Sequence, residues 1–465
     1  MAKRLKLFTY QRKILRFILS RAGAAVFVPP GLGKTAAALA AVKYRKNHLG
    51  HCKTLVIAPL VVAYNTWVTE VTEWDMFSQL SVSLLHGKDK ELRAADNSDI
   101  HVINPEGLKF LLNQFKGKKL PYDMLIVDES TKFKNHNTQR FKMLRRILPQ
   151  FTYRVILTGT PMPRSLLNLF PQMYIVDLGA TLGNRIGQYR ERYFRRTYPL
   201  EYNNWEPRQG SHAAILDKIK DSAITLKASD YRADYKPLRV NNIYLSMDKA
   251  TAKKYRAVEE GLQAELQAVA GALTLPPGVA QKYGKLRQIA SGGLYTEGGD
   301  FELISNQKLD RLTALQGELQ GANMLVGYHY RFTRQQLINY YKDITSIDTH
   351  MSPEDKSRAI ADWNRDRLPI LFGNAGAMAH GLNLHKGSGR DIVWLTLPED
   401  LEVYEQFNAR IYGRTGVTEP VTVHNIIIRG TVEEVILKRL QSRSRQQESL
   451  LDTLRDYYNV KEGKQ

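Results

Sequence analysis

The chain has 465 residues, with 67 Lys or Arg against 46 Asp or Glu, so its formal net charge is +21. This length exceeds what one hydrophobic core supports and predicts two or three domains. The basic excess favours a polyanionic partner, nucleic acid rather than a membrane surface, because no lipidation motif or amphipathic anchor stands out. The alternative is a generically basic, solvated surface.

The apolar pattern and the cysteine content exclude two further classes of protein. No apolar run approaches the ~20 residues of a membrane span, and the first apolar stretch is interrupted by Lys13, Arg16 and Arg21, so we expect no secretory signal. The single cysteine, Cys52, excludes an internal disulfide framework. It also agrees with a reducing cytoplasm, which is the location that we expect.

The first predicted element is a helix at 12–20, whose apolar residues share one face. Tyr10 and Gln11 precede it. A glutamine amide offers a donor and an acceptor together, so Gln11 is a candidate for reading an adenine base. A polar residue on an ordinary helix explains the same position.

A strand, a glycine turn and a helix follow at 26–41. The turn lets the backbone N–H groups face a phosphate chain, Lys34 can reach the β- and γ-phosphates, and the Thr35 hydroxyl can bind Mg²⁺. The full phosphate-loop pattern has a glycine where this chain has Val28, so the match is incomplete. The predicted phosphate-binding residues are Pro30, Gly31, Leu32, Gly33, Lys34 and Thr35.

Short apolar strands then alternate with helices, a pattern that predicts a parallel α/β sheet with ligands beyond the carboxyl ends of its strands. One of these strands ends in Asp128 and Glu129. A nucleotide hydrolase needs one carboxylate for Mg²⁺ and another for the attacking water, and we assign Asp128 to the metal and Glu129 to the water. The predicted strands lie at 54–59, 100–105, 124–130 and 155–161.

The α/β pattern lapses from Gln172 to Thr225, where tyrosines and a phenylalanine alternate with arginines at 185–198. Such a segment suits a nucleic-acid surface, with bases on the aromatic rings and phosphates on the guanidinium groups. A basic helix that buries its aromatic residues against a neighbouring domain fits equally well. The stretch 229–239 resembles an inter-domain connection, and helices are predicted at about 248–273, 281–290 and 431–454.

A second α/β pattern occupies the end of the chain, with strands at 324–328, 370–374, 391–395 and 421–427 and no phosphate loop of its own. Gln406 and Arg410 lie on one predicted helix, and Arg414 follows it. A second domain that offers arginines to a nucleotide held by the first is the arrangement of an arginine-finger motor. The expected domains are 1–180, 181–232 (extension and linker), 233–322 (helical entry) and 323–465.

The order of these motifs resembles superfamily 2 helicases and translocases, most closely the Swi/Snf-type branch in its compact bacteriophage form. The resemblance covers the chain from Tyr10 to about Leu440. It implies two RecA-like parallel-sheet lobes in tandem, with helical insertions and a nucleotide cleft between them. The matching segments are Tyr10–Gln11, 30–35, 55–60 with Trp67, 104–106, 128–130, 157–161, 285–288, 307–310, 324–328, 374–384, 405–414 and 430–434.

The resemblance also implies residue roles. ATP and Mg²⁺ are the implied ligands, with Gln11 and Gly381 beside the phosphate loop and with Thr35 and Asp128 on the metal. Lys34, Asp128, Glu129, Arg410 and Arg414 are the implied catalytic residues. The resemblance implies that hydrolysis is coupled to nucleic-acid contact through Thr158, Gly159, Thr160 and Gln406. The implied nucleic-acid contacts are Pro59, Asn104, Pro105, Asn374 and Ala375.

The two motif VI arginines depart from the family pattern, because Arg410 and Arg414 are four residues apart rather than three. Either the loop carries one extra residue, or only one arginine reaches the γ-phosphate. We favour Arg414 as the finger and Arg410 as its partner.

The resulting hypothesis is a monomeric, DNA-stimulated ATPase that moves along single-stranded, forked or branched DNA in the host cytoplasm, with phage replication, recombination or branch migration as its setting. An RNA helicase or a remodeller that displaces proteins would use the same chemistry. The altered arginine spacing also admits a DNA-binding scaffold with an inactive ATPase. A nuclease is disfavoured, because no further acidic cluster is present.

Overall fold

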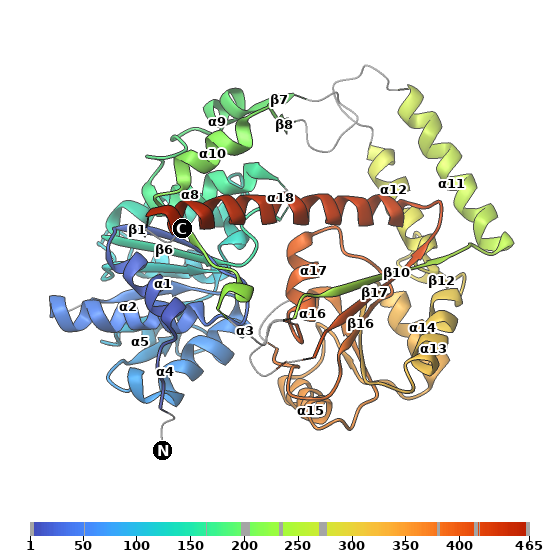
Figure 1. The fold of residues 1–465 in the computed structure, drawn as a ribbon, viewed down its shortest axis with the longest axis horizontal. Helices are drawn as coiled ribbons and strands as arrows, with labels where there is room; N and C mark the ends of the chain where they lie inside the picture. The colour runs from blue at the N-terminus through green and yellow to red at the C-terminus, as the bar shows by residue number, and fades with distance from the viewer. Residues whose placement is uncertain are drawn as a thin grey trace. The chain divides into compact units, whose positions relative to one another are not determined.

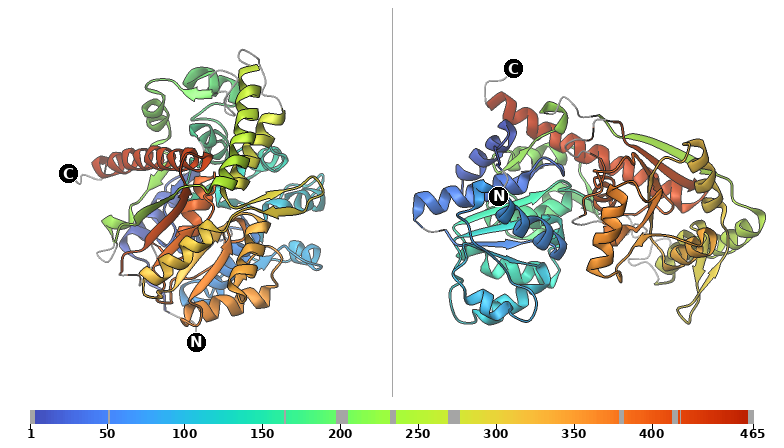
Figure 2. Two further views of the ribbon diagram at one scale, coloured as in Figure 1. Left: turned by 90° about the vertical axis from the view of Figure 1, so that its right-hand side faces the viewer. Right: turned by 90° about the horizontal axis from the view of Figure 1, so that it is seen from below.

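The structure is a computed structural model, which describes residues 4–50, 52–163, 165–196, 205–231, 236–268, 277–378, 382–412, 417 and 419–461. The chain divides into two compact units. Unit 1 comprises Met1–Arg195, Pro207–Ala233 and Arg445–Gln465, and unit 2 comprises Arg196–Glu206 and Asp234–Ser444. Each unit has its own sheet surrounded by helices, as Figures 1 and 2 show. The domain boundaries expected from the sequence remain predictions.

Unit 1 is built on a seven-stranded sheet in the order β3-β4-β2-β5-β6-β1-β9, with every neighbouring pair parallel. Its central strands are apolar and fully buried, as expected of a parallel sheet covered on both faces. The strands are β1 Gly23–Phe27, β2 Thr54–Ile57, β3 Val82–Leu84, β4 Ile100–Ile103, β5 Met124–Asp128, β6 Tyr153–Thr158 and β9 Ala223–Thr225.

The helices of unit 1 connect these strands in the crossover pattern of an α/β sheet. The segment after β2 is helical throughout, with a π-helical stretch at Ala63–Val68. The helices are α1 Thr9–Leu19, α2 Lys34–Leu49, α3 Leu60–Val62, α4 Thr69–Glu73, α5 Lys90–Ala95, α6 Leu108–Gln114, α7 Gln139–Ile147, α8 Leu169–Asp177, α9 Ile186–Tyr193 and α10 Ser211–Ile219.

Unit 2 is built on a six-stranded parallel sheet in the order β10-β17-β16-β13-β15-β14. Along β13, Leu325 belongs to one buried apolar cluster, whereas Met324 and Val326 belong to another, so the sheet has a core on each face. The strands are β10 Arg239–Leu245, β13 Met324–Tyr328, β14 Ser346–Ile347, β15 Ile370–Asn374, β16 Asp391–Trp394 and β17 Thr422–Ile428.

The helices of unit 2 include a pair, α11 and α12, that precedes the first central strand, β13. A small antiparallel pair, β11 Gly293–Tyr295 and β12 Phe301–Leu303, follows α12. The helices are α11 Lys249–Ala268, α12 Pro277–Ala290, α13 Gln307–Glu318, α14 Arg331–Tyr341, α15 Pro353–Asn364, α16 Ala375–Met378 and α17 Leu401–Asn408. The last helix, α18 Val432–Lys461, contributes residues up to Ser444 to unit 2 and the remainder to unit 1.

The predicted fold class of two parallel-sheet α/β lobes is confirmed, together with all the strands that were expected from the sequence. The lapse of the pattern between Gln172 and Thr225 is only partial, because β9 pairs in parallel with β1 and extends the first sheet. The expected connection at 229–239 ends where β10 begins, and β10 pairs with β17 along its whole length.

The arginine-rich segment places its aromatic residues in the core of unit 1. Tyr189, Tyr193 and Phe194 are buried. The Tyr189 ring packs against Phe170, and its hydroxyl donates to the Leu166 carbonyl over 3.0 Å. These three rings are therefore unavailable for stacking on bases, and for them the packing interpretation is correct. Tyr198 lies outside the described residues.

Among the described residues, no helix is both long and apolar enough to cross a membrane.

Candidate functional site

The loop between β1 and α2 has the backbone of a phosphate cradle. Gly31 and Gly33 have φ angles of 87° and 65°, a left-handed conformation that favours glycine. A Cβ atom on Gly33 would lie 2.1 Å from Gln11 Nε2, so a larger residue there would clash. Because α2 begins at Lys34, its first N–H groups lack partners within the helix and are directed towards the loop.

Gln11 is buried against this loop. Its Nε2 lies 3.4 Å from the Leu32 carbonyl oxygen, and its Oε1 accepts from the Phe8 N–H over 2.9 Å. Part of the amide's hydrogen-bonding capacity is therefore used to tie α1 to the loop. Adenine reading by Gln11 stays a prediction.

Strand β5 delivers Asp128 to the same edge of the sheet. The side chain is buried, and both of its oxygens accept hydrogen bonds: Oδ2 from Trp67 Nε1 over 2.8 Å, and Oδ1 from the Glu129 N–H over 3.0 Å. Burial raises the pKa of Asp128, whereas the positive charge of Lys34 and the hydrogen bond from Trp67 lower it. Lys34 and Asp128 are thus close enough to interact electrostatically.

Glu129 has a φ angle of 52°, a left-handed conformation that is strained for a residue with a side chain. Such strain persists where the surrounding structure enforces it, commonly at functional sites. Glu129 is half-buried, whereas Asp128 at the end of the strand is buried. The two carboxylates therefore occupy different environments, as separate roles require.

Sequence reasoning gave Trp67 no role, although it listed this residue within a family motif. The indole is fully buried, and its N–H orients the Asp128 carboxylate. Glu70, three residues further on, has an Oε2 atom hidden from solvent without a hydrogen-bond partner in the described part of the chain. Burial and the nearby Asp128 raise the pKa of Glu70 to about 7. The sequence signal that could have pointed to this pair is its spacing, because residues three apart on a helix lie on the same face.

The segment after β6 lies directly against the phosphate loop. The Thr158 carbonyl accepts from the Val28 N–H over 3.0 Å, and the Thr160 N–H donates to Thr158 Oγ1 over 3.1 Å. A Cβ atom on Gly159 would lie 3.0 Å from Pro30 Cδ, so glycine permits this close approach. A shift of the phosphate loop would therefore also displace this predicted coupling segment.

Sequence reasoning did not predict a second connection to the coupling segment, through Gln172, because no sequence pattern distinguishes this residue. Ser130 Oγ donates to Gln172 Oε1 over 2.7 Å, and Gln172 Nε2 donates to the Pro161 carbonyl over 2.7 Å. Ser130 and Gln172 are fully buried. This amide on α8 links the residue after Glu129 to the end of the coupling segment.

The residues predicted to contact nucleic acid in unit 1 follow β2 and β4, two neighbouring strands. Pro59 and Pro105 are buried, whereas Asn104 is half-buried and donates from Nδ2 to Glu106 Oε2 over 3.0 Å. Because β2 also pairs with β5, these residues lie at the same edge of the sheet as Asp128.

In unit 2, Asn374 ends β15, donates from Nδ2 to the His329 carbonyl over 3.0 Å and accepts from the Gly376 N–H over 3.1 Å. Ala375 is buried behind it. An open groove of about 690 Å³ lies beside Asn374. Its polar lining includes Arg331, Arg334, Gln335, Asp348, Thr349, His350 and Asn374.

Arg410 is buried within its own unit. Its Nε donates to the Gln406 carbonyl over 2.9 Å, and a terminal guanidinium nitrogen donates to the Leu382 carbonyl over 3.1 Å. Gln406 is also buried, and its Oε1 has no hydrogen-bond partner among the described residues. Gly381 and Arg414, two of the predicted site residues, lie outside the described residues.

Comparison with known proteins identifies relatives along most of the chain. The model of the SNF2-related domain matches residues 10–274. Protein p41 of Acyrthosiphon pisum secondary endosymbiont phage 1 is 30% identical over 97% of this chain and 100% of p41. The DNA annealing helicase and endonuclease ZRANB3 of Homo sapiens is 22% identical over 99% of this chain. Chromodomain-helicase-DNA-binding protein 1-like of Danio rerio is 24% identical over 91% of it.

The chain spans the whole of p41 but only 42% and 41% of the other two relatives. Among solved structures, the Sulfolobus solfataricus SWI2/SNF2 ATPase core in complex with dsDNA aligns with a TM-score of 0.45 and 20% identity, covering 96% of this chain and 92% of that one. The domain match covers more than half of the chain, and the similarity to p41 extends along nearly all of it. The chain therefore belongs to the SNF2-related family.

Proposed function

We propose that this protein is a nucleic-acid-stimulated ATPase that uses hydrolysis to move along DNA. The observation that carries the proposal is the meeting of the glycine loop, Lys34 and the Asp128–Glu129 pair at one edge of the unit 1 sheet. Membership of the SNF2-related family supports it, since two of its relatives, ZRANB3 and chromodomain-helicase-DNA-binding protein 1-like, are named as helicases.

The residues present fit a triphosphate. Gly31 and Gly33 open the loop, the N–H groups at the start of α2 face the phosphates, and Lys34 meets the β- and γ-phosphates. Glu129 orients the attacking water and accepts its proton. Gln11 lies against the loop, where its remaining donor and acceptor can meet the base.

The site also fits Mg²⁺, because the buried Asp128 carboxylate lies near Lys34 and close to the loop that ends at Thr35. The ion would be held by the Thr35 hydroxyl, Asp128 and phosphate oxygens, and would neutralise charge on the phosphates. Trp67 holds the carboxylate in place for that task. Arg414, supported by Arg410, is proposed as the arginine that stabilises the transferring phosphoryl group.

The proposed track is DNA, preferably single-stranded, forked or branched. The net charge of +21 supports a polyanionic partner. The proposed contacts lie at or just after the carboxyl ends of strands in each unit: Pro59, Asn104 and Pro105 in unit 1, and Asn374, Ala375 and the neighbouring arginine-lined groove in unit 2. The similarity to a phage protein supports a role in phage replication or recombination.

The test is ATP hydrolysis by the full chain with single-stranded DNA, duplex DNA, forks, four-way junctions and RNA, at one stated salt concentration. We expect stimulation by DNA, strongest for single-stranded or branched forms, and strand displacement or branch migration on the corresponding junctions. Stronger stimulation by RNA would contradict the choice of track. DNA binding without ATP turnover would contradict the motor and indicate a scaffold.

A further inference from the structure

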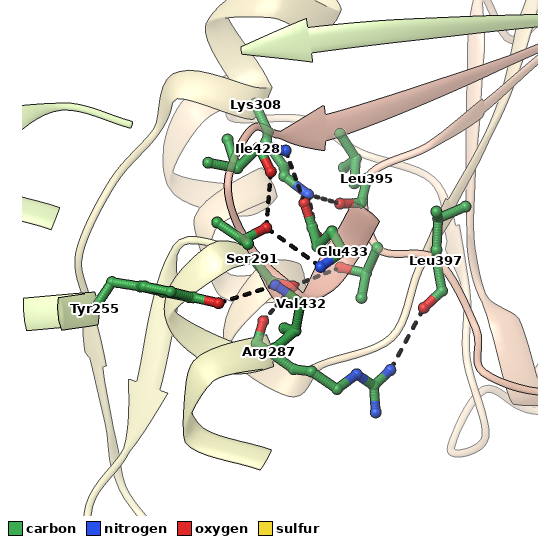
Figure 3. Close-up of polar contacts among 11 residues, drawn as sticks. Tyr255, Arg287, Ser291, Lys308, Leu395, Leu397, Ile428, Val432 and Glu433 are labelled. Carbon is green, nitrogen blue, oxygen red and sulfur yellow. Dashed lines mark hydrogen bonds and ion pairs between the residues drawn. The ribbon is translucent and has the colours of Figure 1, made fainter. Parts of the chain in front are cut away.

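Three family segments in unit 2, at 285–288, 307–310 and 430–434, have no assigned role in the proposed function. In the structure, side chains from all three meet around one short loop (Figure 3). This loop, residues 395–400, connects β16 to α17, the helix that carries Gln406 and leads into Arg410. The contacts of this loop can therefore affect the positions of two predicted site residues, Gln406 and Arg410.

The centre of this arrangement is a buried ion pair between α13 and α18. Lys308 Nζ lies 2.6 Å from Glu433 Oε1 and also donates to the Leu395 carbonyl over 2.7 Å. Glu433 Oε2 accepts from the Ile428 N–H over 3.0 Å. Burial lowers the pKa of Lys308 and raises that of Glu433, while their mutual attraction opposes both shifts. Loss of either side chain would therefore leave the other as an uncompensated buried charge.

A second pair holds the other end of the loop. Arg287, on α12, lies 3.0 Å from Glu399 Oε1 and donates to the Leu397 carbonyl over 3.4 Å. Arg443, on α18, donates to the Glu399 carbonyl over 2.8 Å. Between the two pairs, Thr396 Oγ1 donates to Ser291 Oγ over 3.3 Å. Side chains of three helices, together with Ser291 just after α12, thus hold four of the five residues from Leu395 to Glu399.

The loop passes this constraint directly to α17. Asp400 caps the helix by accepting from the Glu402 N–H over 3.1 Å, and α17 then runs without interruption to Asn408. A rigid helix transmits a shift at its first residue to its last. We propose that Arg287, Lys308, Glu433 and Arg443, here named the loop clamp, are positioning residues that set the orientation of α17 and hence of Gln406 and Arg410 during hydrolysis.

This inference rests on the proposed function for its catalytic consequence, but the positioning itself can be measured independently. Arg287→Met is the chosen variant, because the loss of Arg287 leaves the Lys308–Glu433 pair intact. The matched control is Arg390→Met in the same unit. Arg390 Nε lies 2.9 Å from Glu419 Oε2, and the guanidinium donates to the Gly387 and Gly389 carbonyls over 2.8 and 2.9 Å.

The two ion pairs are closely comparable, since the arginines are 15% and 20% exposed and the glutamates 47% and 66%. Arg390, however, lies before the first residue of β16, at the opposite end of that strand from the loop. Amide hydrogen exchange of a peptide spanning 401–410 is measured by mass spectrometry in the full-length wild type and both variants. Steady-state ATP turnover with DNA is measured alongside.

For Arg287→Met we expect exchange in 401–410 to be about tenfold faster and kcat about tenfold lower, with KM for ATP within about twofold. Arg287→Lys should recover part of kcat, and Arg390→Met should resemble the wild type. Unchanged exchange in Arg287→Met, or a loss confined to KM, would overturn the proposal. If the wild type itself hydrolyses no ATP, the proposed function fails, while the exchange result still decides whether the clamp positions α17.

Discussion

Polar residues gather at the carboxyl ends of the strands in both units, but their partners differ. In unit 1, Asp128 is held by Trp67 and by the backbone, next to a glycine loop and Lys34. In unit 2, Lys308 and Glu433 satisfy each other and two backbone groups. The charged groups at the unit 1 edge thus lie beside a glycine loop, whereas Lys308 and Glu433 in unit 2 are paired with each other.

The difference shows how one architecture serves two purposes. A buried charge needs compensation, and a ligand or a second side chain can provide it. Where a second side chain provides the compensation, removal of either partner leaves a buried charge unpaired, and the intact pair orients its neighbours. Substitutions at the two edges should therefore separate activity from stability.

The largest separation is expected for Glu129→Gln. If Glu129 orients and deprotonates the attacking water, as proposed, loss of its carboxylate should lower ATP turnover by about 10²- to 10⁴-fold. The thermal unfolding midpoint should stay close to that of the wild type, because the substitution conserves shape. Turnover assays beside thermal melts check this, with Glu318→Gln, at a surface ion pair with Arg311, as the control. A comparable loss of turnover in both variants would contradict a specific role of Glu129 in hydrolysis.

Lys308→Met, in the loop clamp, should lower the stability that Glu129→Gln leaves unchanged. Removing one partner leaves Glu433 buried without its counter-ion, so the free energy of unfolding should fall by about 3–5 kcal/mol. Lys46→Met breaks the partly exposed pair with Asp99, separated by 2.8 Å, and should cost only about 0–1 kcal/mol. Urea titrations of the three proteins compare these values. Equal losses would mean that burial does not set the cost.

Trp67→Phe tests the support of the unit 1 edge. The substitution keeps most of the ring volume but removes the N–H donated to Asp128 Oδ2. By analogy with other residues that support metal ligands, the Mg²⁺ concentration for half-maximal turnover should rise about 10-fold or more. Trp394→Phe is the matched control, because that buried indole donates to Asn408 Oδ1 over 3.1 Å in unit 2. A similar Mg²⁺ dependence in both variants would remove Trp67 from the site.

The smallest expected effect concerns the opposite end of the unit 1 sheet, where His101 and Asp96 form a hydrogen bond of 2.8 Å. Burial lowers the pKa of His101. For Asp96, burial tends to raise the pKa, but hydrogen bonds from His101, Ser83 and Ser98 outweigh burial and lower it. The folded state thus binds fewer protons than the unfolded chain at both groups.

Stability from this pair is therefore present above about pH 6.5 and is lost as the pH falls, first through protonation of the unfolded histidine and then of the unfolded aspartate. Urea midpoints between pH 7.5 and pH 5 should fall in the wild type, and more shallowly in His101→Phe. Parallel pH profiles would show that other groups control acid stability. Protonation of His101 should leave the ATP affinity of the wild type unchanged, because this histidine lies near the start of β4, away from the carboxyl ends of the strands.

The positions of the unit 1 candidate residues in the fold could be predicted from the sequence because the elements that carry them are local, whereas the roles of these residues remain predictions. The glycine loop and the Asp128–Glu129 pair are contiguous motifs, and each follows an apolar strand whose burial can be inferred from composition. The edge strands of the two sheets, β3, β9, β10 and β14, were not predicted. Strands β3, β9 and β14 have three residues or fewer, and β10 is half polar and largely exposed, so none of the four shows the apolar run of a central strand.

The supporting contacts could not be predicted, because they join residues far apart in the chain. Trp67 and Asp128 are separated by 61 positions, and Lys308 and Glu433 by 125. A hydrogen bond of this kind leaves no local pattern. The arginine-rich segment had two equally good interpretations from composition, and only the packing of Tyr189 on Phe170 decided between them.

ATP turnover by Lys34→Ala tests the central claim most directly. If the edge of the unit 1 sheet is the hydrolysis site, the wild type turns over ATP faster with DNA, and Lys34→Ala loses that activity by about 10²- to 10³-fold while keeping its far-ultraviolet circular dichroism. Turnover by the variant within about twofold of the wild type would contradict the claim, because the loop would then not hold the reacting phosphates.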